Sequence, residues 1–126
     1  MGLAYYFFRK IGAAASEVQG MLHENFVFLE LRRRAERLKE IALETPAFAT
    51  YKGGEIDFLV KSLSGKESLY AIEVKSGKNA APTGRKALED GKVDYLLLLK
   101  GNTQGGRNGN VITIPVFLFQ KFEFIL

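Results

Sequence analysis

The sequence predicts an α/β fold in which a mixed β-sheet is flanked by helices, and three observations lead to this fold class. A long segment near the N-terminus repeats apolar residues at helical spacing, and several later segments have the composition of strands. One of these strands, residues 95–99, is apolar without alternation, which is typical of a sheet centre covered on both faces. We therefore expect helices on both sides of the sheet, in the chain order α-β-β-β-α-β-β.

The first element is a helix that we expect to run from Ser16 to about Glu44. Ser16 suits the N-cap position, and Thr45-Pro46 ends the helix because the residue before a proline is kept out of helical conformation. The apolar positions recur at steps of three and four, and they are Val27, Leu31, Ala35, Leu38 and Ala42.

Three extended segments follow and predict an antiparallel meander. Glycines and short polar residues between them have the chemistry of hairpin turns. The segments are Ala47–Lys52, Glu55–Lys61 and Glu67–Lys75, with turns at Gly53-Gly54 and Ser62–Lys66.

The second half of the chain predicts one short helix and two more strands. The order is a loop, a helix, an apolar strand, a polar loop and a last strand. Their ranges are Ser76–Thr83, Gly84–Asp90, Val93–Leu99, Gly101–Asn110 and Val111–Phe119.

The composition fits one globular domain that covers residues 1–126, with 47% hydrophobic and 25% charged residues. The formal charge of +4 favours a polyanionic partner only mildly. With no Cys and one His, a metal would bind mainly through oxygen ligands. The apolar run Leu3–Phe8 is too short to span a bilayer, so we expect a cytoplasmic protein without membrane contact.

Charged side chains occur where two of the expected strands should be buried. Alternation places Glu73 and Lys75 on one face of the third extended segment, and Asp57 among core-like neighbours in the second. In a hairpin centred on Gly65, Asp57 lies directly opposite Glu73, with Cβ atoms about 4.5–5.5 Å apart. Two buried carboxylates this close repel each other unless one takes up a proton or both bind a cation.

Two further acids bear on this cluster. Glu24 lies on the helix stripe that should face the sheet, although an acid near a helix start also suits the helix dipole. Glu55 would face Lys75 in the same register and is interpreted as its ion-pair partner. The alternative for the whole cluster is a structural group of ion pairs at the end of the sheet.

These residues resemble the signature of the PD-(D/E)xK nuclease superfamily, in which an Asp on one strand precedes Glu-x-Lys on the next. The matching segments are Gly54–Phe58 and Ile72–Ser76, and the helix segment Glu24–Val27 supplies an acid that many members carry. More narrowly, the chain resembles the nuclease-like domain of unknown function at the C-terminus of a bacterial and archaeal AAA-type ATPase family. That family ends on an Ile-Pro strand, which is Ile114-Pro115 here.

The resemblance implies a restriction-endonuclease-like core that hydrolyses phosphodiester bonds of nucleic acid. Asp57 and Glu73 would bind Mg²⁺ or Mn²⁺ with the Val74 carbonyl as a third ligand, and Glu24 would act through water or complete a second site. Lys75 would orient or deprotonate the attacking water. A bound hard cation that lowers the pKa of water and neutralises phosphate charge is consistent with this chemistry.

The expected partner is nucleic acid, and DNA in particular. Residues that follow the Glu-x-Lys strand are expected to contact the backbone phosphates near the metal, and Arg107 among glycines could also reach a phosphate. The resemblance implies an AAA-type ATPase module in the same chain or operon, with a non-cleaving interaction module as the alternative function. The expected phosphate contacts are Ser76, Lys78, Arg85 and Lys86.

Overall fold

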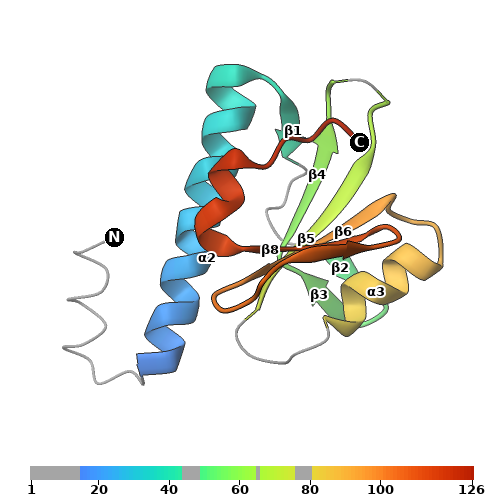
Figure 1. The fold of residues 1–126 in the computed structure, drawn as a ribbon. Coiled ribbons are helices and arrows are strands. Elements are labelled where there is room, and N and C mark those ends of the chain that lie inside the picture. The colour runs from blue at the N-terminus through green and yellow to red at the C-terminus, as the bar shows by residue number, and fades with distance from the viewer. Residues whose placement is uncertain (1–14, 44–48, 65, 76–80) are drawn as a thin grey trace.

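A computed structural model of the chain describes residues 15–43, 49–64, 66–75 and 81–126. It contains a six-stranded mixed sheet with helices on its two faces, and a separate two-stranded ribbon (Figure 1). The α/β fold and the mixed sheet that the sequence predicts are therefore confirmed.

The strands of the main sheet lie in the order β1-β4-β5-β6-β8-β7. The β5–β6 and β6–β8 pairs are parallel, and the other pairs are antiparallel. In chain order, the strands are β1 (Ile41–Leu43), β4 (Phe58–Ser62), β5 (Leu69–Lys75), β6 (Tyr95–Lys100), β7 (Gly106–Asn108) and β8 (Val111–Pro115). The ribbon pairs β2 (Ala49–Tyr51) with β3 (Gly54–Ile56).

The helices cover opposite faces of this sheet. Helix α2 (Ala15–Arg33) continues into a π-helical turn, η1 (Arg34–Leu38), and its residue Val27 packs in one core with Ile72. Helix α3 (Pro82–Glu89) packs its residue Ala87 against Ala71 in a second core. Strand β5 thus contributes alternate residues to the two cores, as its sequence predicts. Within the described ranges, no helix has the length and apolar character needed to cross a bilayer.

The long helix ends earlier than predicted, and a strand takes the place of its last turn. Lys39 adopts a left-handed backbone conformation (φ 55°) directly after η1, which stops the helix. Ile41 then pairs with Ser62 and is almost fully buried. Long-range pairing therefore prevails over the helical spacing of residues 38–42. Ser16 lies inside α2 and is not its N-cap, while Thr45-Pro46 falls outside the described residues.

The predicted three-stranded meander is only partly correct. The β4–β5 pair has the predicted register, with Phe58 opposite Ile72 and Val60 opposite Tyr70. The chain bends at Asp57, however, so β3 separates from β4 and pairs with β2 in the ribbon. Strand β1 occupies the position beside β4 that the meander assigned to residues 47–52.

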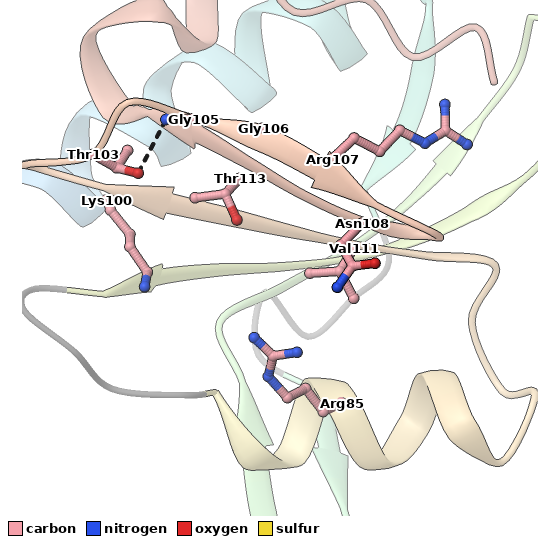
Figure 2. A pocket seen from close by; sticks show the side chains of 9 residues that line it. All are labelled: Arg85, Lys100, Thr103, Gly105, Gly106, Arg107, Asn108, Val111 and Thr113. Carbon is pink, nitrogen blue, oxygen red and sulfur yellow. Dashed lines mark hydrogen bonds between the residues drawn. The ribbon is translucent and has the colours of Figure 1, made fainter.

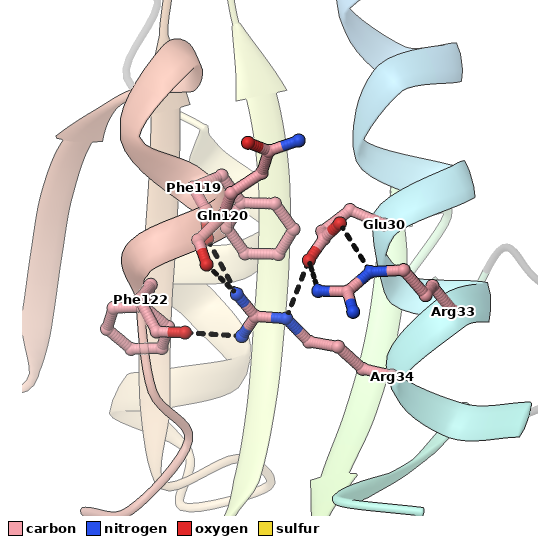
Figure 3. Close-up of polar contacts among 6 residues, drawn as sticks. All are labelled: Glu30, Arg33, Arg34, Phe119, Gln120 and Phe122. Atoms are coloured by element: carbon pink, nitrogen blue, oxygen red, sulfur yellow. Dashed lines mark hydrogen bonds and ion pairs between the residues drawn. The ribbon is translucent and has the colours of Figure 1, made fainter. Parts of the chain in front are cut away.

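The end of the chain also differs from the prediction. The last strand stops at Pro115, and a 3-10 helix, η2 (Val116–Lys121), replaces its second half. The Arg34 side chain stabilises this turn because its Nη2 donates to the carbonyls of Phe119 (2.9 Å) and Gln120 (2.8 Å), while its Nη1 donates to that of Phe122 (Figure 3).

Two smaller boundaries move for similar reasons. Residues 106–108 of the predicted polar loop form β7, because they find a partner in β8. Helix α3 begins two residues early, at Pro82, since the fixed φ of proline suits the first helical position.

Candidate functional site

Asp57 and the Glu-x-Lys residues of β5 come together at the end of the β4–β5 hairpin far from its turn. Asp57 directly precedes Phe58, whose partner is Ile72, so Asp57 lies next to Glu73 in the hairpin. The Val74 N–H donates a hydrogen bond to Asp57 Oδ2 at 2.8 Å. The Asp57 carboxylate is therefore held against the backbone of β5, just beyond the last regular pair of the ladder.

Glu73 is the most deeply buried charged residue of this group, with 1% of its surface exposed. Its Oε2 accepts a hydrogen bond from the Gly84 N–H at 3.3 Å, and its Oε1 lies 3.6 Å from Lys75 Nζ. Burial raises the pKa of Glu73, the charge of Asp57 raises it further, and Lys75 and the Gly84 N–H oppose these effects. The protein thus keeps a carboxylate in an environment that disfavours its charge.

Gly84 allows this arrangement because α3 approaches β5 very closely there. A Cβ at this position would lie 2.8 Å from Glu73 Oε2 and 2.6 Å from Leu96 Cδ1. The first turn of α3 therefore needs glycine, and it brings the positive end of the helix to the Glu73 carboxylate. The sequence prediction missed this role, although a glycine two residues after Pro82 was its visible signal.

Glu24 reaches the same electrostatic environment from α2, on the other face of the sheet. Burial raises the pKa of Glu24, the negative charge of Asp57 adds to this rise, and the positive charge of Lys75 counteracts it. The structure therefore brings all four predicted residues, Glu24, Asp57, Glu73 and Lys75, within electrostatic range at one end of the sheet.

Oxygen atoms are the donors that the cluster offers to Mg²⁺ or Mn²⁺. Among the described residues, no three His, Cys, Asp or Glu side chains are grouped closely enough to enclose a metal. Mg²⁺, however, commonly binds through one or two carboxylates and completes its shell with water and substrate phosphate. Asp57 and Glu73 each use one carboxylate oxygen to accept a backbone N–H. Their hard oxygen donors fit such a two-carboxylate site, and the charge of Asp57 also acts on Glu24.

Other predicted residues lie outside this cluster. Glu55 is exposed and faces Thr50 across the ribbon, so its predicted pairing with Lys75 is wrong. The bend at Asp57 is the physical reason, because it carries β3 away from β5. Ser76 and Lys78 fall outside the described residues.

The two basic residues of α3, Arg85 and Lys86, lie on different sides of the helix. Arg85 and Lys86 are both exposed on the helix, but successive helical residues do not share a face. Hydrogen bonds from Tyr51 and Lys52 are the main causes that lower the pKa of Asp90, and the charge of Lys86 makes a smaller contribution in the same direction. Lys86 therefore belongs to the polar surface around Asp90.

Comparison with known proteins gives one match, to a family model. Residues 19–118 match the Domain of unknown function (DUF4143), a range that contains Glu24, Asp57, Glu73 and Lys75. No curated protein and no solved structure matches the chain. Because the matched range covers most of the 126 residues, the chain belongs to the DUF4143 family.

Proposed function

We propose that this chain is a metal-dependent nuclease-like domain that hydrolyses phosphodiester bonds of nucleic acid, with DNA as the expected substrate. The observation that carries the proposal is the meeting of Asp57, Glu73 and Lys75 at one end of the sheet. The buried position of Glu73 adds support. A buried carboxylate with a raised pKa beside a second acid lowers the stability of the fold, so a role in function would explain why it is there. Such arrangements are concentrated at functional sites.

Each residue has a separate part in the proposed reaction. Asp57 and Glu73 would hold Mg²⁺ or Mn²⁺ with the Val74 carbonyl, and Glu24 would act through a water molecule. The ion would supply a bound water of lowered pKa and neutralise charge on the phosphate. Lys75, whose Nζ lies 3.6 Å from Glu73 Oε1, would orient the attacking water. The N–H groups of Val74 and Gly84 would keep the two carboxylates in place.

The test is cleavage of plasmid and oligonucleotide DNA with Mg²⁺ or Mn²⁺ by wild type, Asp57→Asn and Lys75→Gln. We expect each variant to lose at least about 100-fold in rate, the scale on which positioned acid–base groups contribute. Glu55→Gln is the matched control, because it removes an acid only two positions from Asp57 that lies exposed on β3. Equal activity in wild type and all variants would contradict the proposal, as would an equal loss in the control.

The second candidate is an interaction module of an AAA-type ATPase that keeps the fold without turnover. One observation favours it: both oxygens of Glu73 already have partners, the Gly84 N–H and Lys75 Nζ. Calorimetric titration with Mn²⁺ separates the two functions. Saturable binding that Asp57→Asn abolishes favours the nuclease, whereas absence of binding favours the interaction module.

A further inference from the structure

A second polar site lies beside the proposed catalytic cluster, on the face of the sheet that α3 covers. It is a pocket of about 430 Å³ between α3, β6 and the β7–β8 hairpin (Figure 2). Its lining consists of polar, basic and glycine residues with one valine: Arg85, Lys100, Thr103, Gly105, Gly106, Arg107, Asn108, Val111 and Thr113.

Two cations point into this pocket from opposite walls. Arg85 extends from α3 toward the sheet, and Lys100 extends from the end of β6 toward α3 (Figure 2). Thr113 faces the same space from β8, since its partner Leu98 packs in the core under α3. None of the described lining residues is acidic. The pocket therefore presents two positive charges and a hydroxyl to a ligand, a set that suits a phosphate group.

Arg107 contributes to the wall without directing its charge into the pocket. Its Nε donates to the Gly109 carbonyl at 2.8 Å, and its guanidinium lies 5.8 Å from the centre of the Tyr95 ring. Tyr95 stacks on Tyr70, which belongs to the core on the α2 face of the sheet. Figure 2 shows the Arg107 side chain leaving on the side away from Arg85 and Lys100.

The pocket and the proposed catalytic cluster lie at the same end of the sheet, where β5 and β6 finish. Lys100 is the direct partner of Lys75 in the parallel β5–β6 register. Paired residues of neighbouring strands are about 4.8 Å apart and point to the same face. The cationic pocket thus begins one strand away from the Glu-x-Lys motif, in the direction of β8 and β7.

We propose that this pocket binds a backbone phosphate of the nucleic-acid strand whose neighbouring phosphate lies at the Asp57–Glu73–Lys75 cluster. The Arg85 fork and the Lys100 ammonium pair with the phosphate oxygens, and Thr113 donates its hydroxyl. The position of that neighbouring phosphate rests on the proposed nuclease function, whereas the affinity of the pocket for a strand does not. A free nucleotide or polyphosphate offers the same chemistry. We favour a nucleic-acid strand because the pocket adjoins the proposed catalytic cluster, so one strand could contact both.

Binding without turnover tests the proposal directly. Fluorescence anisotropy in EDTA would measure the affinity of the chain for a short fluorescein-labelled DNA, as single strand and as duplex, at several salt concentrations. We expect Arg85→Gln and Lys100→Gln each to weaken binding by about 5-fold and to reduce the slope of log K against log[salt] by about 0.7–0.9. Lys92→Gln makes the same charge change at an exposed position just after α3 and outside the pocket, and we expect it to leave affinity nearly unchanged.

Three results would overturn the inference. One is equal weakening by all three variants, because it indicates diffuse attraction by net charge. Another is unchanged binding in the Arg85 and Lys100 variants when circular dichroism shows that they are folded. The third is inorganic tripolyphosphate that binds with the same dependence on Arg85 and Lys100 while DNA does not bind, which assigns the pocket to a small anion.

The same experiment separates this inference from the nuclease proposal. Asp57→Asn should abolish cleavage and keep pocket-dependent DNA binding. If wild type binds DNA through Arg85 and Lys100 but never cleaves it, the nuclease proposal is contradicted and the phosphate-binding pocket is retained. If both pocket variants cleave DNA and bind it as well as wild type does, only the proposal that the pocket binds a nucleic-acid phosphate is contradicted.

Discussion

Both carboxylate oxygens of Glu73 have a partner, but the environment is unfavourable to its charge. Its partners are the Gly84 N–H and the Lys75 ammonium, yet burial and the nearby charge of Asp57 raise its pKa. A carboxyl whose pKa is raised by folding destabilises the protein at a pH where the unfolded chain is ionised. This destabilisation disappears as the pH falls below the ordinary glutamate value. A residue that costs stability in this way is expected where function requires it.

Replacing Glu73 by Gln should therefore separate stability from activity. The amide oxygen can still accept the Gly84 N–H, and the buried charge is gone, so we expect the free energy of unfolding at neutral pH to rise by about 1 kcal/mol. Cleavage with Mn²⁺ should be lost. Urea denaturation in EDTA and the plasmid assay measure the two effects. Destabilisation of the Gln variant by more than about 1 kcal/mol would instead identify a structural ion pair.

Gly84 is the second residue whose role depends on a close approach. A methyl group there meets Leu96 and Glu73 at contact distances below 3 Å, so we expect Gly84→Ala to destabilise the fold by about 1–3 kcal/mol. Gly20→Ala in α2 is the control, because no atom lies within 4 Å of its added Cβ. That change should stabilise the helix by about 0.5–1 kcal/mol. Denaturant midpoints of both variants measure the contrast, and equal effects would contradict it.

Among the elements, the junction of α2, η1 and η2 depends on one buried ion pair. Arg34 Nε lies 3.1 Å from Glu30 Oε1, and both side chains are nearly inaccessible to solvent, at 4% and 6% exposure (Figure 3). The other Arg34 nitrogens donate to three carbonyls at the end of the chain. The pair therefore links the end of α2 to η2.

Breaking this link should be costly. Arg34→Lys keeps the charge but loses the planar fork that reaches several acceptors, and we expect a loss of about 1–3 kcal/mol in the free energy of unfolding, the cost of leaving buried carbonyls without a donor. Arg32→Lys is the matched control, because its pair with Glu36 is exposed on both sides and should change stability by less than about 0.5 kcal/mol. Chemical denaturation of the two variants tests this, and similar midpoints would exclude a stabilising link through Arg34.

The same ion pair predicts how stability depends on pH. Burial raises the pKa of Glu30, but hydrogen bonds and charges from Arg33 and Arg34 outweigh it and hold the pKa below the ordinary value of 4.5. Its stabilising contribution is complete above that value and is lost as the pH falls through the lowered value. Wild type should therefore lose its advantage over Glu30→Gln in acid. Unfolding curves of both proteins between neutral pH and acid measure this convergence, and a constant difference would contradict it.

At the scale of the whole molecule, the proposed metal site links ligand binding to folding. A cation that binds the assembled Asp57–Glu73 pair and not the unfolded chain stabilises the fold, by about 2.7 kcal/mol at a hundred times its Kd. We expect Mn²⁺ to raise the melting temperature of wild type and to leave Asp57→Asn unchanged. Thermal unfolding with Mn²⁺ and with EDTA measures this. An equal rise in both proteins points to binding elsewhere.

Alternation and turn chemistry were enough to determine much of the fold. They predicted the α/β class, the register that sets Phe58 opposite Ile72, and the two faces of β5. These features are local, because a strand has a period of two and a hairpin turn sets its register. Once the register is known, Asp57 and Glu73 must lie near each other, so the core of the candidate site followed from the same pattern.

Tertiary structure alone decided the bend at Asp57, the strand at Ile41, the strand at residues 106–108 and the turn after Pro115. Each depends on a partner distant in the chain: β5 for Asp57, β4 for Ile41, β8 for β7, and Arg34 for η2. The same holds for the cationic pocket, because Arg85 and Lys100 meet only when α3 lies against the sheet. Sequence periodicity reports which side of an element is apolar, whereas the choice of distant partner depends on the free energy of the whole packed molecule.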